Sequence, residues 1–223
     1  MSSPSRILGR CLCLLALISC LACTGCSLLV MSQRLILGDD LIQSEFESFT
    51  RVDLTKGKYK LLVVCSTPDS VDRELSTLKL ELIDGVTRRL RREKIPVIDS
   101  DKVANWMDEH GGLPSDPTEL AKDFEADYIV WIDVQEFTLK EENSVKLLRG
   151  RALGFVHVYR VSELDGERQA MTVFNKEFTA TYPPHKPISE VNRSADIFQR
   201  DFVHKVCDQL ARKFYDYRPG LDF

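Results

Sequence analysis

The strongest constraint on the fold is a pair of β-rich runs of nearly equal length that are separated by a turn. The runs are "GRALGFVHVYRVSE" and "RQAMTVFNKEFTATY", and residues 164–167 (Leu-Asp-Gly-Glu) lie between them. Asp165-Gly166 favours a two-residue turn in which both residues have positive φ, and such turns join antiparallel strands. The sequence therefore predicts a long β-hairpin over residues 149–182.

Upstream of this hairpin, short apolar runs alternate with stretches of helical periodicity. "YKLLVVCST", "IPVIDS" and "DYIVWIDVQEFTL" indicate strands, and "KVANWMDEHGG" and "DPTELAKDFEA" indicate short helices. One helix of about 24 residues is predicted from an apolar stripe at three- and four-residue steps, formed by Val71, Leu75, Leu78, Leu82, Val86 and Leu90. A last helix is predicted after Ser194, with the stripe Phe198, Phe202, Val206, Leu210, Phe214 and Tyr217.

This order of elements predicts the fold class. Strand, helix, strand, helix, helix, strand implies an α/β layer in which right-handed crossovers bring some strands into parallel pairs. With the hairpin added, we expect a single α/β domain with a mixed β-sheet and a long C-terminal helix. A chain of 223 residues has room for one such domain. We expect it to cover residues 57–219, and we expect residues 26–56, which lack a clean period, to be a tether with at most one short amphipathic turn.

The first 26 residues have a different character. Arg6 and Arg10 precede an apolar run that contains no charge until Arg34, which is the order of a secretory signal. Residues 24–27 (Thr-Gly-Cys-Ser) resemble the processing site of bacterial lipoproteins, in which small residues precede a cysteine that is acylated and becomes the new N-terminus. The resemblance implies a signal peptide over residues 1–25 and lipidation at Cys26, with Cys23 and then Cys20 as alternative sites.

Two other interpretations compete for this segment. A retained transmembrane anchor is possible because residues 11–31 provide roughly 20 apolar positions, enough to span a bilayer. An iron-sulfur or zinc site is not supported, because Val30 stands where the cysteine spacing would need its fourth thiolate. If the lipoprotein interpretation holds, Ser27 resembles outer-membrane sorting in Gram-negative lipoproteins. The body of the protein would then face the periplasm from the cell membrane or the outer membrane.

The charge of the remaining chain excludes one class of partner. Arg6 and Arg10 are the only charged residues among the first 26, so residues 27–223 contain 28 basic and 34 acidic residues and have a net charge of −6 with histidine neutral. Such a body has no electrostatic footprint for nucleic acid.

Cys65 is the sharpest enzymatic candidate. It lies at the C-terminal end of a predicted strand and before a predicted helix, a position that lowers the pKa of a thiol and suits a nucleophile. The neighbouring Asp69 and Asp72 would oppose that shift, and a buried core thiol is the competing interpretation. Only Cys207 accompanies it in the predicted domain, so a Cys65–Cys207 disulfide is possible in an oxidising compartment.

Other chemistry-bearing residues have ordinary structural explanations. Asp99 flanks a helix start and Asp133 lies on a strand, although both could face a cleft near Cys65, where open α/β sheets bind ligands. None of His110, His157, His185 and His204 has a second histidine at i+3 or i+4 that would make a metal pair, and no cofactor fingerprint is present. "RRLRR" (Arg88, Arg89, Arg91, Arg92) ends a helix, where it suits the helix dipole; contact with a phosphate or lipid head group is the alternative.

The succession "KLLVV", long helix, "IPVID" and "TELAKDFEADYIVWIDVQEF" is similar to the α/β domain of envelope lipoproteins related to the curli-secretion channel subunit CsgG, and to the N-terminal domain of TolB. In those families an alanine-aspartate pair ends a helix and begins a strand, as Ala126-Asp127 does here. The resemblance implies a non-enzymatic, membrane-anchored module that binds another envelope protein or itself. A pore is not expected, because Lys176 and Glu177 would be costly toward lipid. A membrane-anchored enzyme or small-ligand receptor with a cleft near Cys65 is the alternative.

Overall fold

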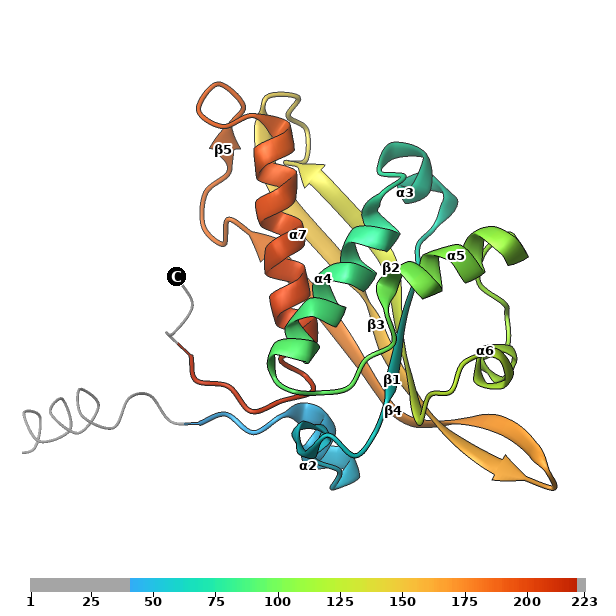
Figure 1. Cartoon of the computed structure of the whole chain (residues 1–223). Helices are drawn as coiled ribbons and strands as arrows, with labels where there is room; N and C mark the ends of the chain where they lie inside the picture. Colours follow the sequence, from blue (N-terminus) through green and yellow to red (C-terminus); the bar gives the residue numbers. More distant parts are fainter. Residues whose placement is uncertain (1–40, 220–223) are drawn as a thin grey trace, which may run out of the picture. The chain divides into compact units, whose positions relative to one another are not determined.

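The computed structural model describes residues 41–219, and residues 43–216 form one compact unit (Figure 1). Outside this unit, Ile42 and Tyr217 form an antiparallel bridge. Among the described residues, no helix is both long enough and apolar enough to cross a membrane. The segment predicted to be a signal peptide or an anchor, residues 1–31, lies outside the described residues.

One mixed sheet organises residues 43–216. Its strands follow the order β1 (Leu61–Ser66), β2 (Tyr128–Lys140), β3 (Leu147–Leu164) and β4 (Glu167–Tyr182), and the short β5 (Ile188–Ser189) pairs with β3. β1 and β2 are parallel, whereas β2, β3 and β4 pair antiparallel. The predicted α/β class with a mixed sheet is therefore confirmed.

The β3–β4 hairpin is as predicted. Leu164 pairs with Glu167, and the two residues between them, Asp165 and Gly166, have φ angles of 53° and 82°. Positive φ at both turn positions matches the right-handed twist of the flanking strands. The Asp-Gly signal therefore fixes the turn and, with it, the register of the two longest strands.

Helices cover the sheet. They are α2 (Glu45–Thr50), α3 (Asp69–Glu74), α4 (Leu78–Arg92), α5 (Ser100–His110), α6 (Pro117–Asp123) and α7 (Ala195–Ala211), with one 3-10 turn, η1 (Leu54–Lys56). Figure 1 shows α4 and α7 side by side across one face of the sheet, and both helices contact its strands. The alternating residues of β2 that include Val130, Ile132 and Val134 are buried in the core.

The single long helix predicted over the stripe Val71–Leu90 is wrong in one respect. The structure divides it into α3 and α4, because Leu75 leaves helical geometry at φ −133° and ψ 65°. Thr77 stands at the N-cap of α4, and its hydroxyl donates to the Glu81 carboxylate at 2.6 Å. Both pieces keep their apolar faces toward the core, which is why the stripe continues across the break.

The strand predicted in "IPVIDS" is reduced to a single parallel bridge between Val97 and Leu61. The Leu61 N–H donates to the Pro96 carbonyl and the Ile98 N–H donates to the Leu61 carbonyl, both at 2.8 Å. Pro96 has no N–H of its own with which to extend the ladder. A strand therefore does not develop at this edge of the sheet.

The compact unit of the structure also extends beyond the predicted start of the domain. The compact unit begins at Gln43 rather than at residue 57. Phe46 of α2 is fully buried, and its ring lies 5.7 Å from that of Tyr128, 5.6 Å from that of Phe174 and 5.7 Å from that of Phe214. Residues 43–56 thus complete the core instead of leading to it.

The last helix is confirmed but is shorter than its stripe. α7 ends at Ala211, while Phe214 continues the buried row beyond the helix. Ser194 occupies the N-cap position as predicted, although its side chain makes no capping hydrogen bond.

Candidate functional site

Cys65 does not have the environment of a nucleophile. Its side chain is fully buried on β1, and burial, together with the nearby Cys207 thiol, raises the pKa of the Cys65 thiol far above its ordinary value of 9.0. Asp72 acts in the same direction, as predicted, but burial is the larger cause. The thiol is therefore neutral at physiological pH and shielded from substrates.

Cys65 and Cys207 are both free, buried thiols. The disulfide that the sequence allows between these two residues is not formed in the structure. Burial likewise raises the pKa of the Cys207 thiol, to about 12, although Arg89 acts in the opposite direction. The two cysteines thus behave as small core side chains.

Cys65, Asp99 and Asp133 do not share a cleft. Asp99 caps α5, where it accepts the Asp101 N–H at 3.2 Å, and this bond, with one from Arg91, lowers the pKa of the Asp99 carboxyl. Asp133 accepts the Ser66 hydroxyl at 2.9 Å. Asp99 lines a hollow near the start of β1, and neither Cys65 nor Asp133 lines that hollow.

The histidines lie apart from one another along the fold. His110 stacks on Trp106, with ring centroids 4.1 Å apart, and its Nδ1 lies 2.8 Å from the Trp106 carbonyl oxygen. His157 stacks against Phe155 on β3. Within the described part of the chain, no group of three or more histidine, cysteine or acidic side chains is arranged to hold a metal ion.

The arginines of "RRLRR" divide into different roles. Arg89 is buried, and its guanidinium joins α4 to α7: Nη1 donates to the Gly85 carbonyl at 2.8 Å, Nη2 donates to the His204 carbonyl at 3.0 Å, and Nε pairs with Asp208. Arg91 instead pairs with Asp99 at 3.2 Å. The cluster is therefore largely occupied within the protein and does not form one free basic patch.

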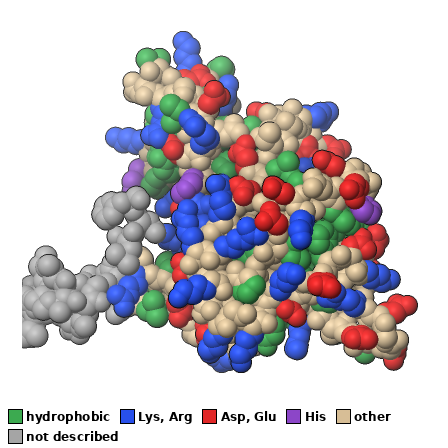
Figure 2. Space-filling view, in the orientation of Figure 1, with side chains coloured by type: hydrophobic (Ala, Val, Ile, Leu, Met, Phe, Trp, Pro, Cys, Tyr) green, Lys and Arg blue, Asp and Glu red, His purple; other side chains and the backbone are tan. Residues whose placement is uncertain are grey.

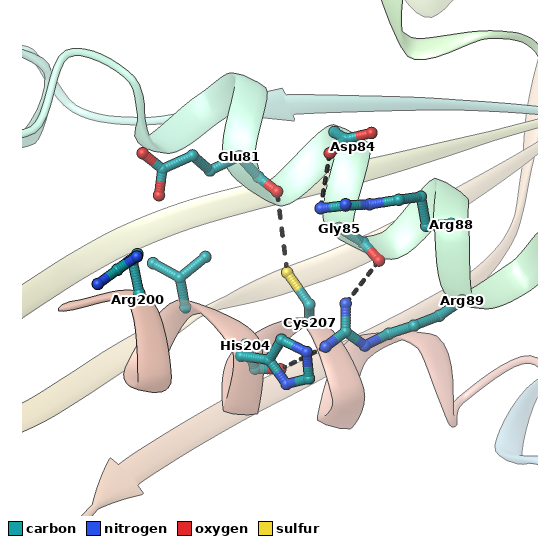
Figure 3. A pocket seen from close by; sticks show the side chains of 9 residues that line it. Glu81, Asp84, Gly85, Arg88, Arg89, Arg200, His204 and Cys207 are labelled. Carbon is teal, nitrogen blue, oxygen red and sulfur yellow. Dashed lines mark hydrogen bonds and ion pairs between the residues drawn. The ribbon is translucent and has the colours of Figure 1, made fainter. Parts of the chain in front are cut away.

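A hollow lies between α4 and α7, and we call it the α4–α7 groove (Figure 3). It has a volume of about 330 Å³, and it is lined by Glu81, Asp84, Gly85, Arg88, Arg89, Arg200, Val203, His204 and Cys207. Figure 2 shows lysine and arginine side chains gathered over these two helices, with acidic groups beside them. The groove is thus charged at its rim and carries both signs.

The sequence patterns point to Arg88, Arg89, His204 and Cys207 separately, and they do not indicate that these residues share a site. No sequence pattern points to Glu81, Arg200 or Val203. Gly85 was the one available signal, because a glycine inside a helix often marks a close approach by another element. A Cβ at Gly85 would lie 2.5 Å from the Cys207 Sγ, so the glycine is what lets the two helices approach and form the floor of the groove.

Comparisons with known proteins give a fold likeness only. No protein-family model matches the chain, and no curated protein matches it significantly. Among solved structures, lipoprotein GNA1162 from Neisseria meningitidis is 15% identical, with 69% of this chain and 98% of that chain covered and a TM-score of 0.38. Protein XCC0632 from Xanthomonas campestris is 14% identical, with 78% and 90% covered and a TM-score of 0.44.

A PelC dodecamer from Paraburkholderia phytofirmans is also similar, at 14% identity, with 78% of this chain and 96% of that chain covered and a TM-score of 0.42. Several of the similar structures are bacterial lipoproteins. At these identities and TM-scores, the likeness does not place the chain in a family or assign it a function. The resemblance to the curli-channel and TolB families stays a prediction.

Proposed function

We propose that this chain is a lipid-anchored protein of the bacterial envelope, acylated at Cys26, whose α/β domain is a non-enzymatic binding or assembly module. The observation that carries the proposal is the order of Arg6 and Arg10, the apolar run, and the residues Thr24 to Ser27 around the cysteine. The domain faces the periplasm, and it binds another envelope protein or a second copy of itself.

The number of residues between the proposed acylation site and the domain is compatible with such a module. Sixteen residues, 27–42, separate Cys26 from the compact unit that begins at Gln43. A chain of that length can reach up to about 55 Å when fully extended. An anchored domain on this tether can meet partners well away from the lipid head groups.

The site chemistry supports a binding role more than a catalytic one. The candidate nucleophile Cys65 is buried and its thiol is held neutral. The α4–α7 groove instead presents side chains of both charges around an apolar floor, an arrangement that suits recognition of a ligand. We therefore place binding in the α4–α7 groove and not at the ends of the strands near Cys65.

Mass spectrometry of the protein purified from bacterial membranes tests the anchor. We expect a mature N-terminus at Cys26 that carries a diacylglyceryl group and an amide-linked fatty acid such as palmitate. Cys26→Ser should abolish incorporation of a labelled fatty acid, whereas the matched variants Cys23→Ser and Cys20→Ser should retain it. An intact segment 1–26 in the mature protein would contradict the proposal and support a retained transmembrane anchor.

Membrane fractionation tests the proposed localisation. We propose that Ser27 directs the protein to the outer membrane, so the wild-type chain should fractionate there. Ser27→Asp should shift it to the inner membrane, while Ser27→Ala should leave it in place. Equal distribution of the aspartate and alanine variants would contradict sorting by this residue.

A further inference from the structure

We propose that the α4–α7 groove binds a small zwitterion, with the cationic end of the ligand at Glu81 and its anionic end at Arg200 and His204. The proposal deepens the binding role given above and rests on that role. It does not depend on acylation of Cys26.

The floor of the groove is apolar and built by close helix contact. Gly85 of α4 lies against Cys207 of α7, and Val203 lines the hollow beside them. Gly85, Val203 and Cys207 are all buried. An apolar floor with a few polar groups at the rim is the usual composition of a small-molecule site, and about 330 Å³ lies at the lower end of the size range of such sites.

Most charges around this floor neutralise one another within the protein. Arg88 pairs with Asp84 on the same helix at 2.8 Å. Arg89 pairs with Asp208 across the two helices. These two arginines and two aspartates therefore leave little net charge to offer a ligand.

Glu81 and Arg200 are left with no ionic partner among the described residues. The Glu81 carboxylate accepts only the hydroxyl of Thr77, at 2.6 Å, while the Arg200 guanidinium makes neither a hydrogen bond nor an ion pair with any residue from 41 to 219. Figure 3 shows both side chains at the same end of the groove, one from each helix, with no bond between them. His204, one turn after Arg200, lies on the α7 side of the groove, where its Nδ1 is 3.5 Å from the Asp208 carboxylate and its Nε2 is the nitrogen left for a ligand.

Opposite charges that face one groove without pairing select a ligand that carries both. A simple anion at Arg200 would meet repulsion from the Glu81 carboxylate, and a simple cation at Glu81 would meet repulsion from the Arg200 guanidinium. A molecule with an ammonium and a phosphate or carboxylate satisfies both side chains at once. Charge-assisted hydrogen bonds of this kind are among the strongest that proteins make.

The same chemistry has two sources in an envelope, a free solute and a lipid head group. O-phosphoethanolamine therefore serves as the soluble probe, with inorganic phosphate and ethanolamine as the two halves of its charge pattern. Dihexanoyl-phosphatidylethanolamine serves as the lipid probe, with dihexanoyl-phosphatidylglycerol as the anionic lipid for comparison. All are titrated by calorimetry into the purified full chain in detergent.

We expect phosphoethanolamine to bind at least about tenfold more tightly than either half, since each charge-assisted contact contributes about one order of magnitude. Glu81→Gln and Arg200→Gln should each weaken that binding about tenfold or more. Glu81→Gln should also strengthen binding of inorganic phosphate, because it removes the repulsive carboxylate. Preference for the ethanolamine lipid over the glycerol lipid assigns a head group, and binding of the free zwitterion alone assigns a solute.

Two variants serve as matched controls. Lys205→Gln removes a positive charge from α7, and Glu74→Gln removes a negative charge from α3, yet neither residue lines the groove. Both should change the affinity less than about twofold. Equal affinity for phosphoethanolamine and its two halves, or the same loss in the control variants as in Glu81→Gln and Arg200→Gln, overturns the proposal. Because binding is measured whether or not Cys26 is acylated, failure here is distinct from failure of the lipid anchor.

Discussion

Gly85 of α4 and Cys207 of α7 are in such close contact that a Cβ added to the glycine would lie 2.5 Å from the cysteine Sγ and 3.3 Å from its Cβ. Real side chains do not approach so closely, so the Cys207 side chain or the two helices would have to move. Gly85→Ala gains up to about 1 kcal/mol of helix propensity, but overpacking a buried contact costs about 1–3 kcal/mol. We expect a net loss of about 1–2 kcal/mol in the free energy of unfolding, measured by urea denaturation.

The matched test of that cause is the double variant Gly85→Ala with Cys207→Ala. Removing the sulfur opens the space that the new methyl group needs, so the double variant should be more stable than the sum of the two single losses predicts. Strict additivity of the two losses would show that the cost of Gly85→Ala arises elsewhere than at the Cys207 contact.

Arg89 is predicted to be the main polar tie between α4 and α7. Arg89→Ala leaves the Gly85 and His204 carbonyls without its guanidinium and the Asp208 carboxylate without its partner. Losing a buried, fully bonded charge costs about 2–3 kcal/mol of unfolding free energy where the partner is partly exposed. Arg92→Ala on the same helix turn, where the side chain is exposed, should cost less than about 0.5 kcal/mol by the same measurement.

Phe46 tests where the folded domain begins. Its buried ring contacts three other aromatic rings, so Phe46→Ala should lower the free energy of unfolding by about 3–4 kcal/mol. Phe49, on the same helix, is 66% exposed and touches the ring of Phe174 alone. Phe49→Ala should therefore cost less than about 1 kcal/mol. Equal, small effects of the two substitutions would mean that α2 is part of the tether after all.

The elements that the sequence predicts well are those determined by neighbouring residues. Asp165-Gly166 sets the hairpin turn locally, through the positive φ that these residues tolerate. Gly111, with φ of 73°, ends α5 in the same way. The strand Tyr128–Lys140 is predicted correctly because its alternation of apolar and polar residues indicates which face is buried.

The sequence predictions differ from the structure where contacts between residues far apart in the chain determine the local structure. Phe46 lies in a segment without a period, and its burial depends on Tyr128, Phe174 and Phe214, none of which is near it in the chain. The apolar stripe does not reveal the break after Glu74, because the stripe residues of α3 and those of α4 both face the core. A one-dimensional pattern records which side is buried, but it does not record whether the backbone between two turns is continuous.

The sequence does not predict the α4–α7 groove for a related reason. Glu81 and Arg200 lie on helices at opposite ends of the domain's sequence, and only the packing of α4 on α7 brings them to one groove. Cys65, by contrast, is conspicuous in the sequence because a position at the C-terminal end of a strand is a local signal. Burial, which is a property of the whole fold, then removed it as a nucleophile.

The two buried thiols should be protected from reagents in the native state. Cys65 and Cys207 are almost inaccessible and are held in the neutral form. The test uses one full-length variant in which all five N-terminal cysteines, Cys11, Cys13, Cys20, Cys23 and Cys26, are replaced by serine. A maleimide at pH 7.5 should label neither Cys65 nor Cys207 of this variant before urea is added, and both afterwards. Rapid labelling of the native protein at Cys65 would contradict its burial.

The same two thiols predict a loss of stability at alkaline pH. Their pKa values are raised above the ordinary value of 9.0 in the folded protein, to about 12 for Cys207. Above pH 9 the unfolded chain therefore releases these protons while the folded chain keeps them. The stabilisation is fully present below pH 9 and is lost as the pH rises toward the folded values, by up to about 1.4 kcal/mol per pH unit for each thiol.

Urea denaturation under reducing conditions at pH 8 and pH 10 measures this loss. Tyr128, Tyr159 and Tyr215 also have pKa values raised by burial, from an ordinary value of 10.0, so the window between pH 9 and pH 10 is the one that reports mainly on the thiols. The double variant Cys65→Ala with Cys207→Ala is less stable at pH 8, but its free energy of unfolding should fall less between the two pH values than that of the wild type. If the free energy of unfolding fell by the same amount in the wild type and in the double variant, the thiols would have the same pKa in the folded and the unfolded chain. That result would contradict their burial in the structure.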